Sequence, residues 1–162
     1  MLRFGNSSMT KLSTCHIDLQ TVCQLAISKG IIDFSVICGH RTEEEQDKLY
    51  PRYTKVKYPD SKHNSYPSQG VDLYPYHPVY KSITGHPSQL KLIAKKEYGD
   101  KPLEVGMALA EGFVKMQYGI MLGVIQASAK ELGVKIRAGY DWDADRDSFD
   151  HSFIDMPHIE LV

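Results

Sequence analysis

The chain of 162 residues has none of the features that direct a protein into or across a membrane. No stretch approaches the roughly 18–20 apolar residues that are needed to span a bilayer. Residues 1–8 carry one positive charge and no apolar segment, so no Sec signal peptide is indicated. We therefore expect no membrane insertion, and we expect synthesis and folding in a cytoplasm. An external substrate would then require release by another factor.

Cysteine is also scarce. The three thiols are Cys15, Cys23 and Cys38, and an odd number without a secretion signal argues against a disulfide framework. We expect buried, reduced thiols, with Cys38 in the interior of a strand.

Excess charge of one sign is missing as well. The formal net charge is -1 with seven neutral histidines, so no global basic field would attract nucleic acid or an acidic membrane. Hydrophobic and charged fractions of 42% and 24% are ordinary for a globular protein. The length indicates one domain over residues 1–162, in which residues 1–9 could be a flexible N-terminus.

Hydrophobic periodicity predicts an α+β domain, since helical patterns accompany a few separated strands. Thr42 followed by three glutamates is typical of a capped helix start. The other expected elements are helices over 11–30 and 103–132, the second broken near Gly119, strands over 31–38, 71–74, 134–138 and 158–162, and a long loop over 51–70.

Two short segments carry metal-binding residue types. Ser61-Lys62-His63 precedes Gly70-Val71-Asp72 across a loop, and Asp155-Met156-Pro157-His158 lies near the end of the chain. Two histidines and one carboxylate are the ligands of an open zinc site, and a further carboxylate can serve as its base. The segments are distant in sequence, so spacing alone leaves open the alternative of ordinary surface or hydrogen-bonded histidines.

Together with Gly39-His40-Arg41-Thr42-Glu43-Glu44-Glu45-Gln46 and Pro67-Ser68-Gln69-Gly70-Val71-Asp72, these segments form ordered blocks. The blocks resemble those of the D-Ala-D-Ala carboxypeptidase and VanY-type metallopeptidases, and most closely the phage endolysins of that group, many of them L-alanyl-D-glutamate peptidases. The resemblance covers about residues 10–162. It implies a hedgehog/D-Ala-D-Ala-peptidase-like domain with a small antiparallel sheet flanked by helices.

The resemblance also implies roles for individual residues. His63, Asp72 and His158 match the zinc ligands, and Asp155 matches the catalytic carboxylate. Arg41 matches an arginine that binds substrate or steadies the oxyanion, and Ser61 matches a position that shapes the site. The loop between His63 and Asp72 is longer than in many relatives, and Gly70 stands where a phage subgroup has alanine.

Other readings of the same residues stay open. Arg41 could pair with a glutamate of its own helix start, Asp155 could be a structural turn residue, and His151 competes for a metal role.

Asp143, Asp145 and Asp147 alternate as calcium ligands do, but the Gly and terminal Glu of an EF-hand are missing. A solvated acidic loop is the alternative to calcium there. Five tyrosines surround the loop between His63 and Asp72, and they would either line a groove or make ordinary packing contacts. They are Tyr53, Tyr58, Tyr66, Tyr74 and Tyr76.

The resulting expectation is a zinc-dependent endolysin that hydrolyses the peptidoglycan stem peptide, most specifically the L-Ala-D-Glu bond. It would be made in the host cytoplasm, act as a monomer and be released by a holin-type pore. The alternatives are a D-alanyl-D-alanine carboxypeptidase, which should carry a secretion signal, and a non-catalytic wall-binding module of the same fold.

Overall fold

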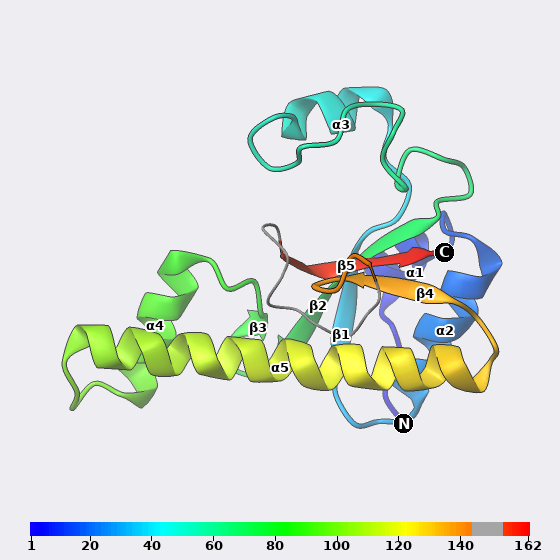
Figure 1. The fold of residues 1–162 in the computed structure, drawn as a ribbon. Coiled ribbons are helices and arrows are strands. Elements are labelled where there is room, and N and C mark those ends of the chain that lie inside the picture. The colour runs from blue at the N-terminus through cyan, green and yellow to red at the C-terminus, as the bar shows by residue number, and fades with distance from the viewer. Residues whose placement is uncertain (144–153) are drawn as a thin grey trace.

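The computed structural model describes residues 1–143 and 154–162. A mostly antiparallel sheet lies at its centre and helices surround it (Figure 1). The helices are α1 (Asn6–Leu12), α2 (Ile17–Ser28), α3 (Glu43–Leu49), α4 (Pro87–Glu97) and α5 (Leu103–Glu131), and the strands are β1 (Phe34–Cys38), β2 (Gly70–His77), β3 (Lys81–Ser82), β4 (Ile136–Gly139) and β5 (Asp155–Leu161). This arrangement confirms the predicted α+β class with a small antiparallel sheet.

The C-terminal strand β5 lies inside the sheet. The strand order is β1-β2-β5-β4, with β3 paired to the far end of β2, and every named pair is antiparallel. Helix α5 runs along one side of the sheet, whereas α3 and the loop after it stand away on the other side (Figure 1). The last residues of the chain therefore contact segments from its first half.

The helix predicted over residues 11–30 is divided in two. Residues 13–16 leave the helical path because they pair with the loop before β2: Ser68 N donates to Thr14 O at 2.9 Å, and His16 N donates to Ser68 O at 2.8 Å. The His16 side chain then caps α2 by accepting from Asp18 N. Residues 1–9, which could have been a flexible N-terminus, contain most of α1, and Ser8 Oγ accepts a hydrogen bond from Val36 N.

Two expected breaks do not occur. The prediction that β2 ends at Pro75 was wrong, because the strand continues to His77. Pro75 lies opposite Phe34 in the β1–β2 register, and the backbone N–H of the next residue, Tyr76, donates to Asp33 O. Proline has no backbone N–H, but none is needed at position 75 for the pairing with β1. The predicted break near Gly119 is also absent, since α5 is continuous over 29 residues.

Helix α5 also corrects the expectation that no segment could span a membrane. By length and composition alone it is long and apolar enough to do so. It nevertheless supplies buried residues such as Ala110, Val114, Met121 and Ile125 to the core, where it packs against α2, α4 and the sheet. A core helix meets the same criterion, so the composition of α5 is weak grounds for membrane insertion.

Candidate metal centre

The structure brings the three predicted ligands together. His63 comes from the loop before β2, Asp72 lies in β2 and His158 in β5, and Asp72 and His158 are direct partners in the antiparallel register. Side chains of directly opposed residues point to the same face of a sheet. The resulting separations are 3.2 Å from His63 Nε2 to Asp72 Oδ1, 3.2 Å from His63 Nε2 to His158 Nδ1, and 3.0 Å from His158 Nδ1 to Asp72 Oδ1.

These three atoms form a nearly equilateral triangle whose dimensions suit zinc. Zinc–ligand bonds of about 2.0–2.1 Å in tetrahedral geometry place neighbouring nitrogen and oxygen ligands roughly 3.3 Å apart. His63 and His158 are buried at 2% and 7% exposure, so the two imidazoles are largely shielded from bulk water. The donor set and its spacing therefore fit a small divalent cation.

The electrostatics of the triangle favour positive charge. Burial disfavours the imidazolium form of His63, but the Asp72 carboxylate outweighs burial and raises the pKa of His63 to about 10. Burial likewise opposes ionisation of Asp72, yet the two histidines hold the pKa of its carboxyl well below the usual range. An ionised carboxylate between two imidazoles is thus stabilised by a cation at this position.

Each of the three predicted ligands makes a second hydrogen bond on the side away from the triangle. His63 Nδ1 lies 2.6 Å from Gly39 O, which leaves Nε2 for the centre. His158 Nε2 lies 2.9 Å from Glu160 Oε2, which leaves Nδ1 for the centre. Arg41 Nη2 donates to Asp72 Oδ2 at 3.2 Å, so Oδ1 faces the histidines. Such outer partners fix which atom of a ligand faces the metal.

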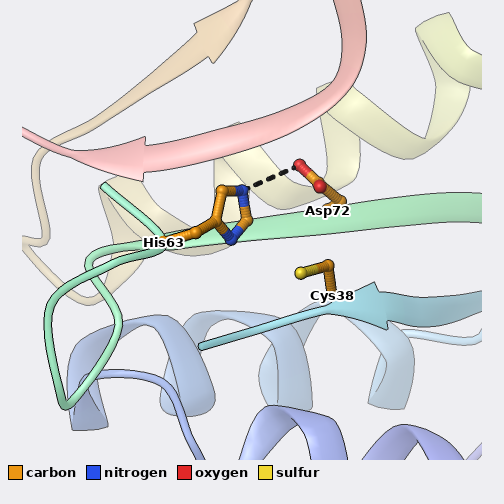
Figure 2. Close-up of side chains that lie close together, drawn as sticks. All are labelled: Cys38, His63 and Asp72. Carbon is orange, nitrogen blue, oxygen red and sulfur yellow. Dashed lines mark hydrogen bonds and ion pairs between the residues drawn. The ribbon is translucent and has the colours of Figure 1, made fainter. Parts of the chain in front are cut away.

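Cys38 is a member of this cluster that sequence reasoning missed. We expected it in the interior of a strand, but Figure 2 shows its side chain beside those of His63 and Asp72. The ligand atoms of these three residues all lie within 4.8 Å of one another. The register explains this, because Cys38 on β1 is the direct partner of Asp72. No local pattern around Cys38 reveals which strand will lie beside β1.

Asp155, the predicted catalytic carboxylate, opens β5 three residues before His158. It lies opposite Gly139 at an irregularity of the β4–β5 pairing, where a Cβ on residue 139 would collide with Asp155 O. Burial, and then the negative charge of Asp72, raise the pKa of the Asp155 carboxyl. A carboxyl with a raised pKa beside a candidate metal site is suited to proton transfer.

Arg41 contacts one of the predicted metal ligands and does not make the alternative ion pair with a glutamate of its own helix start. Its side chain is only 12% exposed, and the guanidinium binds Asp72, together with Gln46 Oε1 at 3.0 Å and Cys38 Sγ at 3.6 Å. It therefore does not pair with a glutamate of α3. The backbone of Arg41 is joined to the His63 loop, because Arg41 N donates to His63 O at 2.8 Å.

Ser61 acts on the same loop. Its hydroxyl accepts a hydrogen bond from His63 N at 3.3 Å, and its own N–H donates to Asn64 Oδ1 at 3.2 Å. Gly70 leaves space on the other side of the site, since a Cβ there would lie 3.0 Å from His158 Cε1. An alanine at position 70 would thus require His158 to shift by a few tenths of an ångström.

A cavity of about 1280 Å³ opens over the cluster, between the sheet and the segment that contains α3. Its lining includes the three ligands and Asp155, together with Arg41, Ser61 and Cys38. Of the five tyrosines around the loop, Tyr53 and Tyr74 line this cavity. This volume exceeds the roughly 300–1,000 Å³ of a typical small-molecule site.

The calcium prediction falls mostly outside the described residues. Asp145 and Asp147 lie there, as does the competing ligand His151, while Asp143 is the last residue before that segment.

The chain is similar to known proteins in sequence and in fold. The sequence model of the family described as phage L-alanyl-D-glutamate peptidase matches residues 1–109 and 111–162. The chain belongs to this family. An L-alanyl-D-glutamate peptidase of Escherichia phage T5 is 28% identical over 163 residues, which cover 99% of this chain and 98% of the relative.

A solved structure gives independent support for the fold. The chain is similar to the Serratia marcescens L-Ala D-Glu endopeptidase ChiX, with a TM-score of 0.64 and 20% identity over 99% of this chain and 90% of that one. The resemblance to endolysins of the D-Ala-D-Ala carboxypeptidase and VanY-type group is thereby confirmed at the level of family and fold.

Proposed function

We propose that the protein is a zinc-dependent endolysin that hydrolyses the L-Ala-D-Glu bond of the peptidoglycan stem peptide. The observation that carries the proposal is the triangle of His63 Nε2, Asp72 Oδ1 and His158 Nδ1, with sides of 3.0–3.2 Å. It lies at the cavity in which Asp155 is also found. Membership of a peptidase family supports the bond class, and the name of that family supports the specific bond.

His63, Asp72 and His158 would hold the zinc ion. Bound zinc supplies a Lewis acid and a water molecule of lowered pKa. Burial and the charge of Asp72 raise the pKa of Asp155, which makes its carboxylate a stronger base toward the attacking water. The protonated carboxyl then delivers the proton to the amine that leaves with the D-Glu half of the substrate. Asp155 thus acts first as base and then as acid.

Arg41 has a defined place in this scheme. Its hydrogen bond to Asp72 Oδ2 restrains a metal ligand, and its position in the cavity wall allows it to contact substrate oxygen. Ser61 would shape the substrate site through its hydrogen bond to His63 N. Lys48, Lys55 and Lys62 also line the cavity, and they offer positive charge to the carboxylates of a stem peptide.

Purified peptidoglycan provides the direct test. The protein is incubated with it before and after chelation, and again after zinc is restored, and the products are identified by mass spectrometry. We expect new N-terminal D-Glu that disappears on chelation and returns with zinc. Release of free D-Ala would identify a D-alanyl-D-alanine carboxypeptidase instead. Full zinc occupancy without any cleavage would identify a wall-binding module.

The biological setting follows from the same proposal. The chain would accumulate in the host cytoplasm as a monomer and reach the wall through a holin-type pore. Expression in a suitable host with and without a pore-forming partner tests this. Lysis that depends on the partner is the expected result, and equally rapid lysis without it would contradict the release step.

A further inference from the structure

The carboxylate of Glu160 has two separate partners at the edge of the metal centre. Glu160 lies on β5 two residues after His158, and it is buried at 4% exposure. Its Oε2 atom lies 2.9 Å from His158 Nε2. Its Oε1 atom accepts hydrogen bonds from Arg137, from Nε at 3.0 Å and from Nη2. Each oxygen therefore serves a different neighbour.

Arg137 explains why the carboxylate can be buried there. It lies on β4 directly opposite Glu160 in the register, so the two side chains meet across neighbouring strands. A buried carboxylate requires such a charged partner. Arg137 also donates from Nη1 to Trp142 O at 2.7 Å. This bond holds the start of the segment after β4 against the same cluster.

Trp142 completes the enclosure of His158. Its ring stacks on the His158 imidazole at 5.7 Å between centroids and an interplanar angle of 30°. The Arg137 guanidinium lies over the Trp142 ring at 5.8 Å. Stacking on Trp142 thus restrains the plane of the imidazole, and the contact with Glu160 restrains the direction in which Nε2 points.

We propose that Glu160 is a positioning residue, held by Arg137, that keeps the proton of His158 on Nε2 and so presents Nδ1 to the metal. This inference rests on the proposed zinc site. A carboxylate that accepts Nε2–H stabilises the tautomer with an unprotonated Nδ1, fixes the ring and makes Nδ1 a stronger donor. A structural ion pair between Glu160 and Arg137 alone would not require the contact of Oε2 with His158.

The proposal predicts the effect of two Glu160 variants on zinc affinity, measured by competition with a chromophoric chelator. Glu160→Ala should weaken zinc binding about 10–100-fold, as loss of an outer partner of a metal ligand usually does. Glu160→Gln retains an acceptor for His158 but loses the charge, so a smaller loss is expected. Glu131→Gln is the matched control, because it removes a carboxylate from an ion pair with Lys29 at the end of α5.

The position of the proton gives a second readout that a merely structural role would not change. In nitrogen-15 correlation spectra of the zinc-loaded protein, His158 should show a protonated Nε2 and a metal-bound Nδ1. In Glu160→Gln the Nε2–H resonance should shift and exchange faster with water. Thermal unfolding of the metal-free proteins separates this effect from a loss of folding. If Glu160→Ala does not fold, Glu160→Gln carries the test.

The outcomes separate this inference from the proposed function. Wild-type zinc affinity together with an unchanged His158 resonance in the Glu160 variants would overturn the positioning role and leave the zinc site intact. A wild-type protein that binds no zinc would instead overturn the proposed function. Weakened zinc binding together with an altered His158 resonance in the Glu160 variants, but not in Glu131→Gln, supports the inference.

Discussion

Asp72 and His158 are 86 positions apart in the chain but directly opposite each other in the sheet, and Asp72 Oδ1 lies 3.0 Å from His158 Nδ1. The sheet backbone sets this distance, since β2 and β5 are hydrogen-bonded neighbours. His63 reaches the same point from a loop that is joined to Arg41 and to Gly39. The geometry of the candidate metal centre therefore depends on strand register and on a small number of loop contacts.

The register makes His158 a sharp test of metal binding. His158→Gln should lower the bound zinc, measured by atomic absorption after dialysis against a weak chelator, to a small fraction of the wild-type value. The reason is the loss of one of three protein ligands. His86→Asn provides the control, because His86 is exposed and caps α4 away from the triangle. Undiminished zinc in His158→Gln would exclude His158 as a ligand.

Asp155 can be separated from the ligands by its effect on turnover. Asp155→Asn should retain zinc and lower kcat about 10²–10⁴-fold, the usual contribution of a general acid–base. Activity is measured as release of stem-peptide fragments, with zinc content determined on the same samples. Asp100→Asn, on an exposed carboxylate after α4, should leave both unchanged. Normal turnover by Asp155→Asn would remove Asp155 from the mechanism.

The pH dependence should report the same carboxyl. The proposed base Asp155 can act only when it is deprotonated, so kcat/KM should fall as the pH drops through its pKa. Burial and Asp72 raise that pKa, which places the acidic limb above the value of about 3.9 for an ordinary aspartate. If the acidic limb of the wild-type kcat/KM profile lies at or below the pKa of an ordinary aspartate, Asp155 is not the base. Asp155→Glu should move the limb without abolishing it.

Gly39 offers a test of the orientation of His63. A Cβ at this position would collide with Lys11 O and Thr14 Oγ1, so Gly39→Ala should displace the strand end whose carbonyl accepts from His63 Nδ1. We expect a loss of roughly 1–3 kcal/mol in the free energy of unfolding, together with weaker zinc binding. Chemical denaturation and chelator competition measure the two effects.

An exposed glycine provides the comparison for Gly39. A Cβ on Gly112 of α5 would meet open space, so Gly112→Ala should be neutral or slightly stabilising, because alanine favours a helix. Equal behaviour of the two variants would show that the close approach at Gly39 does not matter.

The thiols should differ in reactivity. Burial raises the pKa of Cys15 to about 12 and also raises that of Cys23, so both are held as unreactive thiols. Cys38 is half-buried and lines the cavity. Iodoacetamide at pH 8 should therefore alkylate Cys38 at least tenfold faster, as measured by peptide mass spectrometry. In denatured protein all three rates should converge, and equal labelling of the folded protein would contradict the prediction.

The sequence by itself determined the local features of this protein. The start of α3 was predicted correctly because a capping box is a local arrangement: Thr42 and Glu45 bond reciprocally within one helical turn. The candidate ligands His63, Asp72 and His158 were named from short motifs and their resemblance to a known family, and the α+β class from periodicity. Each of these depends on residues close together in the chain or on ordered motif blocks.

Only the tertiary structure decided which side chains surround those ligands. Cys38 and Glu160 join the cluster because β1, β2, β5 and β4 lie side by side, and no local pattern encodes that order. The turn at residues 13–16 likewise exists because Ser68 binds Thr14 and His16. Pairing between distant segments outweighs local helical preference when it satisfies backbone hydrogen bonds in the interior. For that reason the candidate ligands could be named from the sequence, whereas the contacts of Cys38 and Glu160 with them could not.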